Sequence, residues 1–261
     1  MKLGIIREGK TPSDSRVVLS PKQCRSLLDL YPQFEIKVQP SDIRCFTNEE
    51  YNTQGIELNE DVSDCDVLLG IKEVPQDLLI PEKTYFFFSH TIKKQEHNRQ
   101  MLKHILASNI RLIDWETLTD SNGHRVIAFG RWAGIVGAHN GILTWLNRIG
   151  KPAPKPMNKC KNMKEAIQDY QDLELENVKI VLTGDGRVSS GAVEVLELMN
   201  IRNVNADEFL HETFHEPVFT QLNNSHMFYT SGSQHFDNIH YHQFPELYRS
   251  KFYLTLRLQM L

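Results

Sequence analysis

Short apolar runs alternate with amphipathic stretches along the first half of the chain. The apolar runs contain many β-branched and aromatic residues and predict buried strands over residues 3–6, 34–38, 67–71, 84–89 and 111–114. Between them, the stretch after Pro21 and residues 96–107 place apolar side chains at helical spacing. Strands that alternate with helices predict a mainly parallel α/β sheet.

Polar residues mark the starts of two helices and one turn. Ser20 precedes Pro21, which is the order expected of an N-cap and the first helical position. Thr47 and Glu50 have the spacing of a capping box and predict a second, short helix. An Asn-Gly turn at residues 122–123 is followed by residues 126–129, which predict one more short strand.

The second half begins with a long helical pattern over residues 131–149. It is rich in glycine and alanine, which predicts close packing against another element. The following residues, 151–164, carry three prolines and five lysines. This composition favours a solvated surface loop over an anion-binding segment.

Residues 178–192 form an apolar strand pattern, a glycine turn and a helical pattern in succession. Gly184 and Gly186 fill the first two positions of G-x-G-x-x-G, Ser189 fills the third, and Gly191 lies two residues later. Glycines let a backbone approach a pyrophosphate, and the first N–H groups of the next helix face its charge. The turn predicts a dinucleotide site, with an ordinary strand–turn–helix corner as the alternative.

These patterns predict an α/β protein with two Rossmann-like domains joined by a long helix. Residues 1–135 would form a catalytic and substrate domain, residues 136–176 a connecting helix and linker, and residues 177–261 an NAD-binding domain. A dinucleotide domain usually has five or six strands, whereas two or three fit here. The second domain is therefore expected to be incomplete at its C-terminus, where residues 253–261 alternate like a strand.

Composition excludes several classes of partner. The 261 residues carry a net charge of −4 without a clustered basic face, so we expect no nucleic acid. No apolar run approaches ~18 residues, so we expect no membrane span. The four cysteines are widely separated, which indicates reduced thiols in a cytoplasmic protein. His235, His240 and His242 form a loose cluster without further ligands, so we expect no metal site.

Two titratable residues follow predicted strands of the first domain. Lys72 comes directly after residues 67–71, and His90 comes directly after residues 84–89. The carboxyl ends of parallel strands form the crevice where ligands bind, so the two side chains could face one cleft and exchange protons there. The alternative is that Lys72 pairs with a surface acid and His90 caps a helix.

Further charged residues could reach the same crevice. Arg16 lies between the first strand and the first helix, where its guanidinium could bind a substrate carboxylate or remain solvated. Glu73 and Glu116 follow strand patterns and could tune the charges of Lys72 and His90.

Together these residues resemble the alanine dehydrogenase and lysine-forming saccharopine dehydrogenase superfamily. The segments at residues 69–73, 88–95 and 125–134 are similar to the Gly-[Leu/Ile]-Lys-Glu, Phe-x-His-x-x-Lys-x-Gln and Arg-Val-x-Ala-Phe-Gly-x-x-Ala-Gly segments of the saccharopine branch. Arg16 matches the early arginine of the family. The resemblance extends from about residue 3 to about residue 200.

The resemblance implies an NAD-dependent oxidation of saccharopine to lysine and 2-oxoglutarate. Lys72 would accept the amine proton, and His90 would act as acid–base during imine hydrolysis. The residues implied in substrate binding or modulation are Arg16, Glu73, Lys93, Glu116 and Arg125. The residues implied in NAD binding are Gly184, Gly186, Arg187, Ser189, Gly191 and, on the ribose, Asp207. The alternatives are an alanine dehydrogenase and a non-catalytic remnant that binds a ligand or partner.

Overall fold

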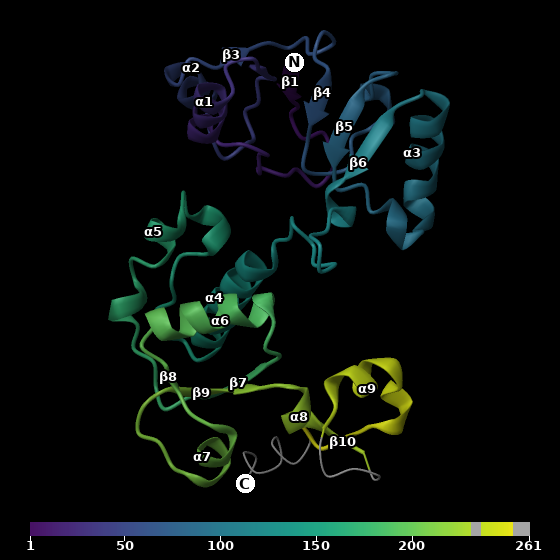
Figure 1. Ribbon diagram of the computed structural model, residues 1–261. Coiled ribbons are helices and arrows are strands. Elements are labelled where there is room, and N and C mark those ends of the chain that lie inside the picture. Colours follow the sequence, from purple (N-terminus) through teal and green to yellow (C-terminus); the bar gives the residue numbers. More distant parts are fainter. Residues whose placement is uncertain (231–235, 253–261) are drawn as a thin grey trace. The chain divides into compact units, whose positions relative to one another are not determined.

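A computed structural model describes residues 1–230 and 236–252 (Figure 1). The chain divides into two compact units, Met1–Ala128 and Phe129–Leu261. Each unit has its own sheet and its own core. The predicted limit at residue 135 lies inside the long helix α4, and the lysine-rich loop lies inside the second unit.

The first unit is built on a six-stranded, all-parallel sheet in the order β3-β2-β1-β4-β5-β6. The strands are β1 (Lys2–Ile5), β2 (Glu35–Val38), β3 (Glu57–Leu58), β4 (Val67–Leu69), β5 (Thr84–Phe87) and β6 (Arg111–Asp114). This is the strand order of a doubly wound sheet, in which the chain reverses direction across the sheet between β1 and β4. Ligands of such sheets bind beside the carboxyl ends at that reversal. The prediction of a parallel α/β fold is confirmed.

Capping explains where the helices of this unit begin. In α1 (Pro21–Leu30) and α2 (Asn48–Thr53), the predicted caps Ser20 and Thr47 each form a capping box. Both caps satisfy N–H groups that have no partner within the helix. The third helix, α3 (Glu96–Ala107), has the predicted bounds.

Apolar residues cover both faces of this sheet. On β5, Tyr85 and Phe87 pack into one buried cluster, while Phe86 between them packs against the other. On β1, Leu3 and Ile5 join the second cluster. Successive side chains of a strand point to opposite faces, so continuous apolar runs produce a sheet covered on both sides.

The strand predicted over residues 126–129 is wrong. An isolated bridge joins Thr119 and Arg125, and the N–H of Val126 donates to the carbonyl of Leu118 at 2.9 Å. Phe129 is then the N-cap of α4. A strand needs a neighbour along its length to satisfy its backbone groups, and the short turn at Gly123 provides only this narrow loop.

The second unit combines a long helix with a three-stranded parallel sheet, β7-β9-β8. Its main elements are α4 (Gly130–Arg148), α5 (Met163–Ala166), β7 (Lys179–Thr183), α6 (Arg187–Leu198), β8 (Arg202–Asn203), α7 (Ala206–His211) and β9 (Val218–Leu222). They are followed by α8 (Asn224–Met227), β10 (Phe228–Tyr229), α9 (Asn238–Gln243) and β11 (Arg249–Ser250), with β10 and β11 antiparallel. The strand predicted over residues 253–261 lies outside the described residues.

Glycines allow α4 and α6 to cross at very short range. A Cβ atom added to Gly134 would lie 1.7 Å from the carbonyl oxygen of Val188, and one added to Gly191 would lie 1.9 Å from that of Arg131. Both positions therefore require a hydrogen in place of a side chain. Among the described residues, no helix is both long and apolar enough to cross a membrane.

Candidate active site

The carboxyl ends of β4 and β5 bring Glu73 and His90 into direct contact. The register pairs Leu69 of β4 with Phe86 of β5, and the ladder continues past both strands, since the N–H of Phe88 donates to the carbonyl of Ile71 at 2.9 Å. Two residues further along each chain, His90 Nδ1 lies 2.6 Å from Glu73 Oε1. The residue next to Lys72 is thus the partner of His90.

Glu73 is a largely buried carboxylate held between Lys10 and His90. Its other oxygen, Oε2, lies 2.5 Å from Lys10 Nζ, and its side chain is only 10% exposed. Burial acts to raise the pKa of Glu73, but the hydrogen bonds from Lys10 and His90 outweigh it and place the pKa below its ordinary value. Glu73 is therefore ionised and orients the imidazole.

The positions of His90 and Lys72 bear on the alternative roles of these two residues. His90 is the N-cap residue of a short 3-10 helix, η2 (Thr91–Lys93), but its side chain makes no capping hydrogen bond. Lys72 is half-buried. Its ammonium makes no hydrogen bond or ion pair with any residue in 1–230 or 236–252. The positive charge of Lys72 adds to the hydrogen bonds from Arg16 in lowering the pKa of Asp14, although the two side chains are not in direct contact.

The segment after β1 supplies three more charged groups. Glu8 accepts hydrogen bonds from the backbone N–H groups of Ile71 at 2.7 Å and Lys72 at 2.8 Å. Arg16 donates from Nε and Nη2 to both oxygens of Asp14, at 2.9 and 2.5 Å. These hydrogen bonds hold the pKa of Asp14 below its usual range. The guanidinium of Arg16, which was expected to bind a substrate carboxylate, therefore binds Asp14 through Nε and Nη2.

The end of β6 holds a second charged cluster. Glu116 Oε1 lies 3.2 Å from Lys93 Nζ and 3.4 Å from Arg125 Nη1. The side chain of Glu116 is 13% exposed, and its Oε2 atom has no hydrogen-bond partner among the described residues. Glu116 thus contacts Lys93 and Arg125. The carboxylate that contacts His90 is that of Glu73.

In the second unit, the glycine turn between β7 and α6 fits a pyrophosphate. Gly184 has a φ of +92°, and a Cβ on Gly184 or Gly186 would meet no heavy atom within 4 Å. Gly186 is the N-cap of α6 and offers no side chain to its first N–H groups. Open space above an uncapped helix N-terminus suits an anion, and Arg187 begins that helix.

The other residues expected at the nucleotide have structural partners. Ser189 donates its hydroxyl to the carbonyl of Gly184 at 2.7 Å, and Gln221 also donates to that carbonyl, at 2.9 Å. Gly191 faces α4. Asp207, expected near the end of the second strand, lies in the first turn of α7, is 90% exposed and is 3.6 Å from His211. Their roles toward NAD stay predictions.

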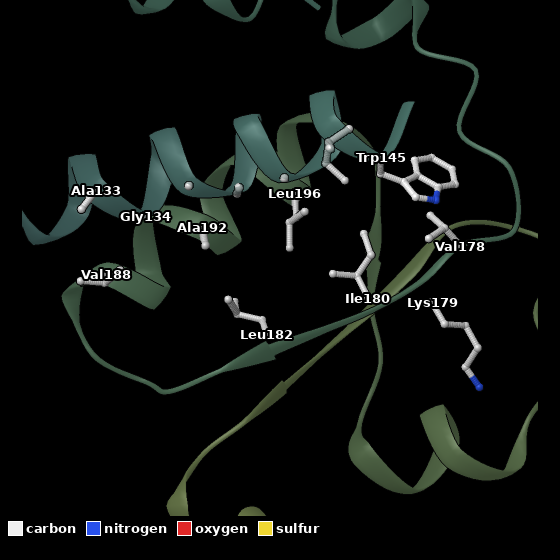
Figure 2. A pocket seen from close by; sticks show the side chains of 14 residues that line it. Ala133, Gly134, Trp145, Val178, Lys179, Ile180, Leu182, Val188, Ala192 and Leu196 are labelled. Atoms are coloured by element: carbon white, nitrogen blue, oxygen red, sulfur yellow. The ribbon is translucent and has the colours of Figure 1, made fainter. Parts of the chain in front are cut away.

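A separate apolar cavity of about 480 Å³ lies within the second unit, between α4, α6 and β7. Figure 2 shows Ala192, Ile180 and Leu182 pointing into it, whereas Lys179 extends away. The Lys179 ammonium contacts the carbonyl of Phe209. The cavity is lined mainly by hydrocarbon, with the indole of Trp145 at one side, so it lacks titratable groups suited to acid–base chemistry.

No group of three or more histidine, cysteine or acidic side chains converges as a metal site in residues 1–230 and 236–252. His240 Nδ1 lies 3.0 Å from the hydroxyl of Tyr248, and His235 is outside the described residues.

Three residues of the site did not stand out in the sequence: Glu8, Lys10 and Asp14. They lie in the polar segment after the first strand, beside Arg16. Their position between a strand and a helix was the available signal, because loops at strand ends carry ligand-binding groups. Nothing in the segment alone shows which strand they approach.

Several known proteins are similar to this chain in sequence. The N-terminal domain of the alanine dehydrogenase/PNT family matches residues 4–136. The mitochondrial alpha-aminoadipic semialdehyde synthase of Bos taurus is 32% identical over 272 residues, covering 96% of this chain and 29% of the relative. The saccharopine dehydrogenase [NAD(+), L-lysine-forming] of Emericella nidulans is 30% identical, covering 75% of this chain and 56% of the relative.

Solved structures share the fold at low identity. An L-alanine dehydrogenase superposes with a TM-score of 0.57 and 17% identity, covering 85% of this chain and 61% of that one. The chain spans less than a third of the bovine relative and just over half of the fungal one. The matching domain covers about half of the chain, and together with the similar relatives it leads to one conclusion: the chain belongs to the alanine dehydrogenase/PNT family.

Proposed function

We propose that the protein is an NAD-dependent amino-acid dehydrogenase that cleaves saccharopine to lysine and 2-oxoglutarate. The observation that carries the proposal is the hydrogen-bonded group Lys10–Glu73–His90, with Lys72 beside it, at the carboxyl ends of β4 and β5. A lysine and an oriented histidine at a crevice can move protons near neutral pH.

His90 is prepared for acid–base chemistry by Glu73. With Nδ1–H donating to the carboxylate, Nε2 is left to accept a proton from water or substrate. A bound NAD would take hydride from the carbon that carries the secondary amine. Lys72 would accept the amine proton, and His90 would deprotonate the water that adds to the imine. His90 would then protonate the departing amine of lysine.

The charge of the crevice supports saccharopine over a smaller substrate. Saccharopine carries three carboxylates, whereas alanine carries one. Arg16, bound to Asp14, follows β1, while Lys93 and Arg125 share Glu116 after β6. Two separate groups of basic side chains suit a substrate with carboxylates far apart.

The test is to follow NADH formation with saccharopine and with alanine under identical conditions. We expect turnover with saccharopine, and the reverse reaction with lysine and 2-oxoglutarate. Turnover with alanine alone would assign the chain to the alanine dehydrogenases. Calorimetry with NAD distinguishes a third possibility. A folded sample that shows neither heat of NAD binding nor turnover would be a non-catalytic remnant that binds another ligand or a partner.

A further inference from the structure

Glu8 forms an unusual connection between the two strands at the reversal of the sheet. The β1–β4 ladder ends where the N–H of Ile6 donates to the carbonyl of Leu69, at 3.0 Å. Beyond it, the two oxygens of Glu8 accept the successive N–H groups of Ile71 and Lys72, at 2.7 and 2.8 Å. Successive N–H groups that converge on one carboxylate form an anion-binding concavity.

We infer that Glu8 is the positioning residue of the acid–base site, an inference that rests on the proposed function. Its carboxylate fixes the backbone from which the side chains of Lys72 and Glu73 project. Because Glu73 in turn binds Lys10 and His90, one carboxylate sets the placement of four functional groups. Glu8 acts through these residues and does not itself transfer a proton to substrate.

The position requires an ionised carboxylate. Each oxygen of Glu8 accepts one N–H, and a protonated oxygen would present a donor to a donor. Burial raises the pKa of Glu8, while the two backbone N–H groups oppose the rise. Two charged neighbours also act on the pKa of Glu8: Asp14 raises it and Arg16 lowers it. Lys72, whose backbone N–H donates to Glu8, is the third charged residue nearby.

The experiment compares Glu8→Gln and Glu8→Asp with the wild-type chain. Glutamine keeps the shape but places an amide donor against one N–H, and aspartate keeps the charge but is too short to reach both. Since a misplacement of ~1 Å can lower a rate about 100-fold, we expect kcat to fall roughly 10- to 100-fold in each variant. We also expect an altered acidic limb of the kcat–pH profile and unchanged NADH affinity.

Glu60→Gln is the matched control. Glu60 pairs with Arg7, next to Glu8, but its side chain is 62% exposed. It should keep wild-type kinetics, because exposed pairs contribute little. If folded Glu8→Gln has the kcat and pH profile of the wild type, Glu8 is not a positioning residue.

A second measurement separates this inference from the proposed reaction. Lysine acylation followed by mass spectrometry reports the surroundings of Lys72 without turnover, with exposed Lys22 as the internal reference. We expect Glu8→Gln to change the labelling rate of Lys72 relative to Lys22 by at least about twofold. An unchanged ratio overturns the inference, whereas a changed ratio in an enzyme inactive on every substrate overturns only the proposed reaction.

Discussion

At the scale of single residues, the site is a set of charges that differ in how completely they are paired. Glu73 contacts both Lys10 and His90, Arg16 is bound to Asp14, and Lys72 makes no ion pair among the described residues. A lysine without a fixed partner can release its proton, and as a neutral amine accept one from substrate, without breaking a salt bridge. For this reason Lys72 is the residue assigned as proton acceptor in the proposed reaction.

Replacing Lys72 tests that role directly. In Lys72→Met we expect turnover to fall by about 10²–10⁴-fold, the range for loss of one acid–base group. NADH affinity should be nearly unchanged, because Lys72 lies in the first unit. Steady-state kinetics and NADH titration measure the two effects. Lys22→Met, at an exposed site of α1, is the control. Equal activity in Lys72→Met would remove Lys72 from the mechanism.

Glu73 gives a prediction about stability and pH. Hydrogen bonds from Lys10 and His90 outweigh burial and hold the pKa of Glu73 in the folded protein below its ordinary value, so folding favours the ionised form. The stabilisation is complete above that value and is lost as the pH falls through the folded pKa. Glu73→Gln should therefore lower the free energy of unfolding by about 1–3 kcal/mol near neutral pH. Once the pH has fallen below the folded pKa of Glu73, the variant and the wild type should converge.

Urea unfolding at several pH values measures this difference. Glu35→Gln is the control, since exposed Glu35 lies 3.8 Å from Lys2 on the surface. Such a pair is worth at most ~1 kcal/mol. A gap between Glu73→Gln and the wild type that stays constant down to acid pH would show that the Glu73 charge does not stabilise the fold.

At the scale of elements, two features hold the candidate site residues in place. They are the strand ends of the first sheet and the crossing of α4 and α6 in the second unit. The crossing holds α6, and with it the glycine turn, against the long helix through Gly134 and Gly191. The small residues of α4 thus have a packing reason that is independent of any ligand.

Glycine replacements in α4 test this packing. In Gly134→Ala the new methyl group would overlap the carbonyl of Val188, so we expect a loss of at least about 1–3 kcal/mol in the second unit. In Gly137→Ala the methyl group meets nothing within 4 Å, so the better helix propensity should add about 0.5–1 kcal/mol. Urea unfolding compares the two. Equal stabilities would mean that the helices can separate at little cost.

At the scale of the whole molecule, the two units have separate cores and separate candidate sites. The charged groups at the strand ends belong to the first unit and the glycine turn to the second. If the proposed function is right, the two ligands should stabilise different parts of the chain.

Hydrogen exchange with each ligand tests this division. At 100 times its dissociation constant a ligand stabilises the state that binds it by roughly 2.7 kcal/mol. NADH should slow exchange around residues 184–191, and lysine with 2-oxoglutarate should slow it around residues 70–73. Mass spectrometry of peptides locates the effect, and residues 20–30 serve as an internal control. NADH protection confined to the first unit would contradict the assignment of the glycine turn.

The sequence alone determined the elements and the outline of the site. Apolar runs and caps are local, so five of the six strands of the first sheet, the bounds of α3 and the cap at Ser20 could be predicted. The two-residue strand β3 was not predicted, because it is too short to show an apolar pattern. The strand predicted over residues 126–129 failed because a strand depends on a neighbour that local pattern does not show. The motif around Lys72 and His90 identified the family before any contact was known.

Only the tertiary structure decided which charges meet. Glu8 and Lys10 reach the residues after β4 because β1 lies beside β4, a pairing between segments more than sixty residues apart in the chain. Strand order is set by packing of the whole sheet, so no local spacing shows it. For the same reason Gly191, which the family resemblance implied in NAD binding, lies at the contact point of two helices.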